Sequence, residues 1–374
     1  MRRMTGRERL EAIFQGRIPD RPAVKLWGCD NARRPRHPAY EPIHDLGLRT
    51  TDLIFSAQSP FSLYAGRRAL ELTHSSRRPT ASPEWAEQVT VMHTPLGDLE
   101  EVFLASTGNR PGYHKTYYLK EPNDLRKLLS LPYEPFAFSL DNWQRRQADV
   151  GGNGIAMFGL DHAMYGLQRL IGSENFALWS WDAEDLLLQV MHRFAERILA
   201  HTQAALAAGV RGVFGWVGPE LCIPPLMSPA LFDRYVAALD KPLIDLIHNA
   251  GSRVWVHCHG RMTPVLERFV AMGVDVLNPI EPPPMGDITL EQAFARVGNR
   301  MGLEGNLETH DVMMGTPEIL RPKITAALEA GRGRRFILCP CSGYDENVDP
   351  KPHEILNWRF FLEESVRQAE SLRG

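Results

Sequence analysis

Three potential metal ligands, His257, Cys258 and His259, stand at the end of a short apolar run. Imidazole and thiolate groups are ligands that zinc takes in proteins. The run begins after Gly251 and ends at Gly260, a pattern typical of a buried strand between two loops. Because side chains at positions i and i+2 of a strand lie on the same face, we expect His257 and His259 to point together and Cys258 to point away.

A second pair of thiols, Cys339 and Cys341, follows another apolar run further along the chain. Two imidazoles and one thiolate suit catalytic zinc, which takes three protein ligands and leaves one position open. If the two segments meet in space, the sequence predicts a metal site made by His257, His259 and Cys341. The alternative is that the histidines are hydrogen-bonded core residues and that the cysteines act as small hydrophobic side chains.

The elements that must position these side chains are short apolar runs that alternate with amphipathic helices. The predicted strands are an early one at 23–27 and then 155–160, 212–217, 253–258, 274–279, 301–305 and 336–339. Such alternation predicts a parallel sheet with right-handed crossovers. We therefore expect an α/β fold, a single (β/α)8 barrel of the TIM type, with one domain that covers residues 1–374 and an N-terminal helical region.

Helix starts in this region are marked by residues that commonly cap helices. Asp182 precedes a predicted helix that ends at Gly209. Three further starts place a capping residue directly before a proline, which favours the first helical position: Ser228-Pro229, Thr263-Pro264 and Thr316-Pro317.

Residues 80–120 interrupt the alternation. The segments 87–94 and 100–105, joined through a turn at 95–97, have the pattern of two paired strands. We therefore expect a β-hairpin inserted before the main barrel units.

Composition and charge are those of an ordinary soluble enzyme, with 44% hydrophobic and 23% charged residues. The formal net charge of -3 gives no reason to expect a nucleic acid as a partner. No run approaches the roughly 20 apolar residues of a membrane span, and the N-terminus does not have the pattern of a signal peptide. Five scattered cysteines do not make a disulfide framework. We therefore expect a cytoplasmic protein with reduced thiols.

Other polar and aromatic side chains also stand where predicted strands end, and the loops after the strands build the active site of an α/β barrel. The candidates for catalysis are Glu220, His162 and Tyr165. The candidates for substrate binding are Trp27, Trp216, Glu281 and Asn306. Glu220 is a candidate fourth ligand or general acid, and the tryptophans are candidates for an aromatic wall against a planar ligand. The alternative for these residues is ordinary packing or a solvated loop.

Several segments resemble the uroporphyrinogen decarboxylase superfamily, in the same order along nearly the whole chain. They are the opening residues 5–22, Met227-Ser228-Pro229-Ala230-Leu231-Phe232, the strand end His257-Cys258-His259-Gly260, Leu303-Glu304-Gly305-Asn306, and the turn Cys341-Ser342-Gly343. The resemblance implies a (β/α)8 barrel, in agreement with the alternation of strands and helices.

Two branches of that superfamily differ in chemistry. True uroporphyrinogen decarboxylases need no cofactor and grip substrate carboxylates with an Arg-Gln-Ala-Gly-Arg run, which residues 26–34 lack here. Zinc-dependent methyltransferases of the second branch bind zinc through a His-x-Cys-Gly motif and a distant cysteine. This chain is similar to the second branch, with His257 and Cys341 in matching places and His259 in place of the motif cysteine.

The resemblance therefore implies a metal-dependent methyl (C1) transferase with Zn²⁺ as its cofactor. The methyl group would pass to or from a corrinoid on a separate partner protein, or to a thiol acceptor, and the resemblance also implies a homodimer. One alternative is a cofactor-free decarboxylase of a uroporphyrinogen-like or carboxylated aromatic substrate, which Arg33, Arg34 or Arg36 would grip. Another alternative is a non-catalytic barrel that binds a small molecule or a metal.

Overall fold

The computed structural model describes residues 2–108 and 110–373, and its main sheet has eight parallel strands. Their order around the sheet is β1-β12-β11-β10-β9-β8-β7-β2, which is the order of a (β/α)8 barrel. The strands are β1 Ala23–Val24, β2 Leu53–Ala57, β7 Gly154–Gly159, β8 Val213–Val217, β9 Arg253–His257, β10 Val276–Ile280, β11 Gly302–Leu307 and β12 Phe336–Pro340. The predicted fold is confirmed, and β2 is the barrel strand that the sequence pattern did not indicate.

Strand β1 pairs with β12 and β2 pairs with β7, and the barrel closes between β1 and β2 through the backbone and side chain of one residue. Asp52 precedes β2; its N–H donates to the carbonyl of Val24 at 2.7 Å, and its carboxylate accepts the N–H of Val24 at 2.9 Å. The same carboxylate forms buried ion pairs with Arg9 and Arg21. Arg9 lies on helix α1 (Gly6–Phe14), whose apolar side chains pack into the lower barrel core. Asp52 thus links the seam, which is the closure between β1 and β2, to helix α1.

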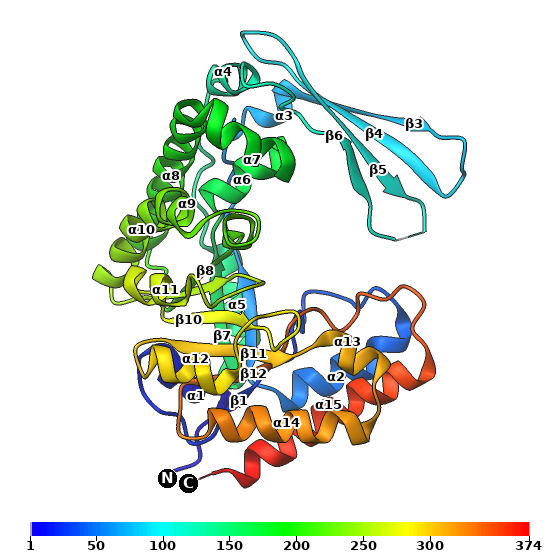
Figure 1. Ribbon diagram of the computed structural model, residues 1–374, viewed down its shortest axis with the longest axis vertical. Coiled ribbons are helices and arrows are strands. Elements are labelled where there is room, and N and C mark those ends of the chain that lie inside the picture. Colours follow the sequence, from blue (N-terminus) through cyan, green and yellow to red (C-terminus); the bar gives the residue numbers. More distant parts are fainter. Residues whose placement is uncertain (1, 109, 374) are drawn as a thin grey trace.

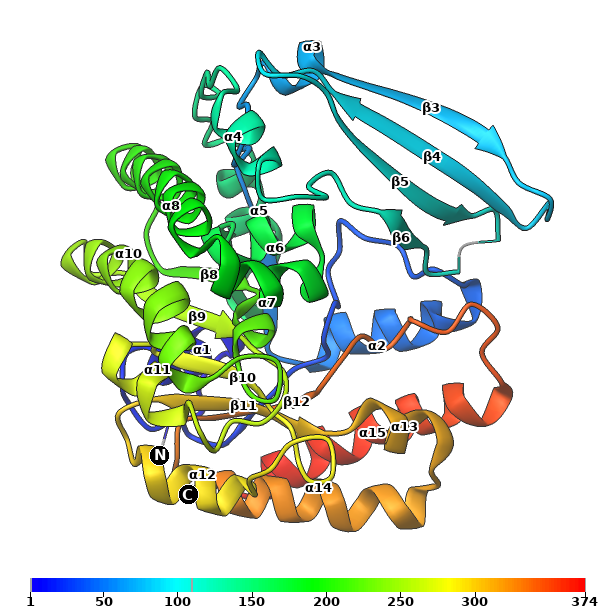
Figure 2. The ribbon, with the colours of Figure 1, turned by 45° about the horizontal axis from the view of Figure 1, so that its top comes forward.

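Helices follow the strands, and most of them cover the outside of the barrel (Figure 2). They are α2 Glu41–Thr50, α3 Ala69–Leu72, α4 Asp124–Leu129, α5 Asp141–Val150, α6 Ala163–Ile171, α7 Ser173–Asp182, α8 Glu184–Ala207, α9 Pro229–Phe232, α10 Ala238–Asn249, α11 Leu266–Met272, α12 Leu290–Val297, α13 Thr309–Met314, α14 Pro317–Gly331 and α15 Pro352–Ser371. Shorter turns are η1 Pro38–Tyr40, η2 Gly151–Asn153, η3 Pro219–Cys222 and the π-helical η4 Asp233–Ala237. Among the described residues, none of the helices is long and apolar enough to cross a membrane.

The predicted helix starts are correct at two positions and shifted at two. Ser228 caps α9 by accepting the N–H of Leu231, and α14 spans the predicted segment after Thr316. Asp182, in contrast, ends α7 and does not cap α8, because the interruption between the two helices lies one residue later, at Ala183. Helix α11 begins two residues after Pro264, because the Thr263 hydroxyl donates to the carbonyl of Asp287 in another loop and does not cap the helix.

The inserted segment is a four-stranded antiparallel sheet with the order β3-β4-β5-β6. Its strands are β3 Thr73–Pro79, β4 Trp85–Met92, β5 Leu99–Ser106 and β6 Tyr113–Thr116. The predicted hairpin is confirmed as β4 and β5, which pair along their whole length. The sequence did not indicate β3 because this strand is polar and exposed almost throughout, so it shows no alternation. The sheet projects away from the barrel (Figure 1).

Candidate functional site at the mouth of the barrel

Two histidine rings lie together at the C-terminal end of β9. The ring centroids of His257 and His259 are 4.5 Å apart, and the rings are nearly perpendicular. Nδ1 of His257 bonds to Oδ1 of Asn278 at 2.6 Å, and Nδ1 of His259 bonds to Oε1 of Glu281 at 2.8 Å. Within the described residues, no hydrogen bond engages either Nε2. Each ring is therefore oriented by the hydrogen bond at its Nδ1, and its Nε2 stays available to a ligand.

The two histidines have opposite electrostatic environments. Burial, with the adjacent charge of His259, lowers the pKa of His257 to about 4. Burial by itself would also lower the pKa of His259, but the hydrogen bond and charge of Glu281 outweigh it and raise this pKa. Glu281 also accepts the N–H of Gly260 at 2.6 Å. Glu281, which the sequence predicts as a substrate ligand, thus uses both carboxylate oxygens to hold the loop of His259.

Carboxylates gather around His259 from three strand ends. Glu220 in η3, Glu281 after β10 and Glu308 after β11 all act on the charge of this imidazole. Oε2 of Glu220 and Oε1 of Glu308 are buried and have no hydrogen-bond partner among the described residues. Burial raises the pKa of both carboxyl groups. Cys341 follows β12 and lies beside Glu308; burial and this carboxylate raise the pKa of the thiol well above its usual value.

The side chains of this region are of kinds that bind a divalent cation, but they do not lie close enough together to form a binding site. Across residues 2–108 and 110–373, no three His, Cys, Asp or Glu side chains converge closely enough to hold a metal ion. The structure brings His257 and His259 together, whereas Cys341 contacts Glu308. Buried carboxylate oxygens without partners are costly, and a cation bound nearby would offset that cost. Metal-binding histidines also commonly have their second nitrogen held as these two have.

A buried ion pair lies beneath the histidines. Lys25 pairs with Glu304, and Nε1 of Trp255 donates to the same carboxylate at 2.9 Å. The Lys25 ammonium is 4.6 Å from the ring centroid of Trp27, and Trp27 stacks on His257 with centroids 4.9 Å apart. Lys25 and Glu304 are not among the site residues predicted from the sequence. Their signal is a charged residue inside an apolar strand, since a buried charge requires a partner.

The mouth cavity, of about 460 Å³, opens beside this stack and is lined by Trp27, Lys25, Trp255 and three arginines. Arg33 holds Asp345 with two contacts of 2.8 and 2.7 Å, and Arg146 pairs with Asp30 and Asp149. Arg145 is exposed and makes no ion pair within the described part of the chain. Trp27 therefore stands where the sequence predicts an aromatic wall, at a partly basic entrance.

Two predicted site residues lie on the outer side of the barrel, at α10. Nε1 of Trp216 donates to Oδ2 of Asp240 at 3.1 Å, and Nε2 of His162 bonds to the same oxygen at 3.1 Å. Nδ1 of His162 accepts the N–H of Tyr165 at 3.2 Å and so caps α6. Trp216 points outward because alternate residues of β8 face opposite sides. Trp216 is therefore absent from the mouth cavity, and His162 has both ring nitrogens engaged.

The remaining predicted residues have separate places. Asn306, predicted to bind substrate, has a φ of 89° and donates from Nδ2 to the carbonyl of Ile280 at 2.9 Å, which braces β11 against β10. Tyr165 lines a different cavity beneath the inserted sheet. Cys258 is fully buried. Burial, with the charges of Glu220 and Cys222 among others, raises the pKa of its thiol.

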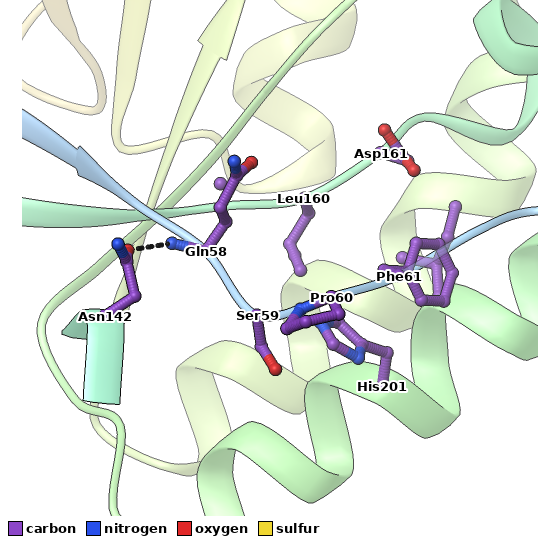
Figure 3. A pocket seen from close by; sticks show the side chains of 10 residues that line it. Gln58, Ser59, Pro60, Phe61, Asn142, Leu160, Asp161 and His201 are labelled. Atoms are coloured by element: carbon purple, nitrogen blue, oxygen red, sulfur yellow. Dashed lines mark hydrogen bonds between the residues drawn. The ribbon is translucent and has the colours of Figure 1, made fainter. Parts of the chain in front are cut away.

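A further cavity of about 550 Å³ lies beside the ends of β2 and β7, between Asn142 and His201 (Figure 3). His201 projects from α8 and its ring lies 4.7 Å from the Phe61 ring, with Phe138 and Phe158 also close. This burial lowers the pKa of His201 from 6.5 to about 4. The folded protein therefore keeps His201 neutral at a pH where the unfolded chain protonates it.

We expect this histidine to make the protein less stable in mild acid. Between pH 6.5 and 4 the unfolded state binds the extra proton, so the stabilisation present above pH 6.5 is lost as the pH falls towards 4. The His201→Gln variant should lose roughly 1 kcal/mol less stability over this range, a value discounted for partial exposure. Denaturant midpoints at both pH values measure the difference. Equal losses in both proteins would contradict the role of His201.

Comparisons with known proteins place the chain in a family. The model of the uroporphyrinogen decarboxylase (URO-D) family matches residues 147–356, more than half of the chain. A uroporphyrinogen decarboxylase of Prochlorococcus marinus (strain MIT 9303) is 28% identical over 201 residues, which are 50% of this chain and 53% of that protein. One from Parasynechococcus marenigrum (strain WH8102) is 26% identical over 231 residues, 59% and 61% of the two chains. The chain thus spans about half the length of the first of these curated relatives.

The fold is shared over the full length with a solved structure. A methyltransferase from Methanosarcina mazei superposes with a TM-score of 0.60 at 16% identity, covering 98% of this chain and 99% of that one. At this identity the likeness establishes a common fold. Together with the family match over the barrel strands that carry His257, Glu281, Glu308 and Cys341, it leads to one assignment. The chain belongs to the uroporphyrinogen decarboxylase family.

Proposed function

We propose that this protein is a metal-dependent methyl (C1) transferase that uses zinc. The observation that carries the proposal is the pair of imidazoles at the end of β9. Asn278 and Glu281 hold the Nδ1 atoms of His257 and His259, and the two Nε2 atoms have no hydrogen-bond partner in the described residues. Zinc-binding histidines are commonly oriented by such outer contacts. A shared fold with a protein named as a methyltransferase agrees with the proposal.

In this proposal His257, His259 and Cys341 would hold the ion. Zinc bound there would supply Lewis acidity, which would keep an acceptor thiol as thiolate or polarise the ether oxygen of a methyl donor. Glu220 holds its proton to a higher pH than an exposed carboxyl group, because burial raises its pKa. It is therefore the residue that we assign to donate a proton to the leaving group. Glu281 orients His259 and also fixes Gly260.

The methyl acceptor or donor is proposed to be a corrinoid on a separate protein, or a thiol. A corrinoid on a separate partner protein is what the sequence resemblance implies. A homodimer and a cytoplasmic location stay predictions from the sequence.

A cofactor-free decarboxylase is the second candidate, and the mouth cavity favours it. Trp27 supplies an aromatic face, and Arg33 and Arg145 supply positive charge at the entrance. Sequence relatives are named uroporphyrinogen decarboxylases. Arg33 is already held by Asp345, so Arg145 is the arginine that we expect to meet a substrate carboxylate.

Elemental analysis and chelation separate the two candidates. We expect about one zinc ion per chain after purification from zinc-supplemented cells. Demethylation of methylcobalamin in the presence of mercaptoethanol, followed by absorbance, should stop with phenanthroline and return with added zinc. A protein without metal under these conditions would contradict the proposal. If the protein still releases CO2 from a carboxylated aromatic probe after chelation, this result would favour the decarboxylase.

A further inference from the structure

A cavity of about 420 Å³ lies between the inserted sheet and the barrel, and we call it the insert cavity. Glu101 of β5 and His114 of β6 line it from the sheet, and Tyr165 and Arg169 line it from α6. It shares Val217, the last residue of β8, with the mouth cavity. The inserted sheet thus contributes to a second binding space next to the candidate site.

Charges of both signs surround the insert cavity without neutralising one another. Arg169 makes no ion pair within the described residues, and its charge acts on both Glu101 and Asp161. All three charges also act on the pKa of Tyr64, and all four residues line this cavity. Burial raises the pKa of both carboxyl groups and outweighs the opposite effect of the Arg169 charge.

His114, which lies on the inserted sheet, does not add a second positive charge to the insert cavity. Nδ1 of His114 is 3.5 Å from Oε2 of Glu101, and burial lowers the pKa of His114. The imidazole is therefore neutral near pH 7. Tyr64, Tyr118 and Tyr165 also line the cavity, and tyrosine rings are side chains that can bind an organic cation.

We propose that the insert cavity binds the zwitterionic head of an α-amino acid. Its carboxylate would bind Arg169, and its ammonium group would lie between Glu101 and Asp161. A simple anion would be repelled by two carboxylates, and a simple cation would leave Arg169 without a partner. A zwitterion, in contrast, can pair with the groups of both charges. The role of this ligand as the second substrate of a group transfer rests on the proposed function, but its binding does not.

Isothermal titration of the full-length protein in the presence of a chelator tests the binding directly. The probes are L-norleucine, its decarboxylated analogue pentylamine and its deaminated analogue hexanoate, which share one hydrocarbon chain. We expect L-norleucine to bind at least about tenfold more tightly than either analogue. Because the probes carry no transferable methyl group and no metal is present, failure of the zinc proposal would leave this result unchanged.

Variants assign each end of the zwitterion to its residue. Arg169→Gln should weaken L-norleucine at least about tenfold and leave pentylamine unaffected. Glu101→Gln should weaken L-norleucine and pentylamine but not hexanoate. Arg193→Gln, an exposed arginine on α8, is the matched control. Equal affinities for the three probes, no binding of L-norleucine at about 10 mM, or an Arg169→Gln variant that binds all probes as the wild type does would overturn the proposal.

Discussion

Replacing His257 by alanine is expected to lower the zinc content and methyl-transfer rate of the purified protein at least about tenfold, since an outer-contact loss alone often costs this much. Cys341→Ala should have the same effect, because each variant removes one of three proposed ligands. Asn278→Ala should give a smaller loss, as it removes the contact that orients His257 at 2.6 Å. Elemental analysis and the methylcobalamin assay measure all three variants.

Two controls separate ligand loss from general damage. Cys258→Ala removes a buried thiol that is not one of the three proposed ligands, and His201→Ala removes a half-buried imidazole that lines another cavity. Both should retain wild-type zinc, with circular dichroism as the check on folding. Zinc content that stays at the wild-type level in His257→Ala and Cys341→Ala would place the metal elsewhere.

The Asp52→Ala variant is expected to lose about 3–5 kcal/mol of unfolding free energy, the range for breaking a buried ion pair. It leaves the guanidinium groups of Arg9 and Arg21 without this carboxylate and removes the acceptor of the Val24 N–H. The seam between β1 and β2 would then keep only the backbone bond from the Asp52 N–H. Urea unfolding followed by tryptophan fluorescence measures the loss.

An exposed ion pair supplies the control for this prediction. Asp245 pairs with Lys241 on α10, and both side chains are about half exposed. Asp245→Ala should therefore cost only about 0.5 kcal/mol or less. Asp52→Asn, which keeps an oxygen near the Val24 N–H but not the charge, should fall between the two. A cost for Asp52→Ala as small as that for Asp245→Ala would show that the seam does not depend on this carboxylate.

Much of the barrel was predictable because its signals are local. Apolar runs bounded by glycine mark β7 to β12, and the proline after Ser228 or Thr316 marks a helix start. Strand β2 is not bounded by glycine and was missed for that reason. The exposed strand β3 shows no alternation, so the insert was predicted as a hairpin of half its real size. The seam at Asp52 depends on Arg9 and Arg21, whose role as its partners appears only once the chain ends meet the barrel.

For the candidate site, the sequence by itself determined that His257 and His259 share one face, since strand alternation fixes this over two residues. It also located Glu220, Glu281 and Cys341 at strand ends. Only the tertiary structure decided what each side chain contacts. Trp216 and His162 turn to Asp240, Glu281 holds His259, and Cys341 lies beside Glu308. The physical reason is that these contacts join strands far apart in the chain, whose relative twist and depth no local pattern records.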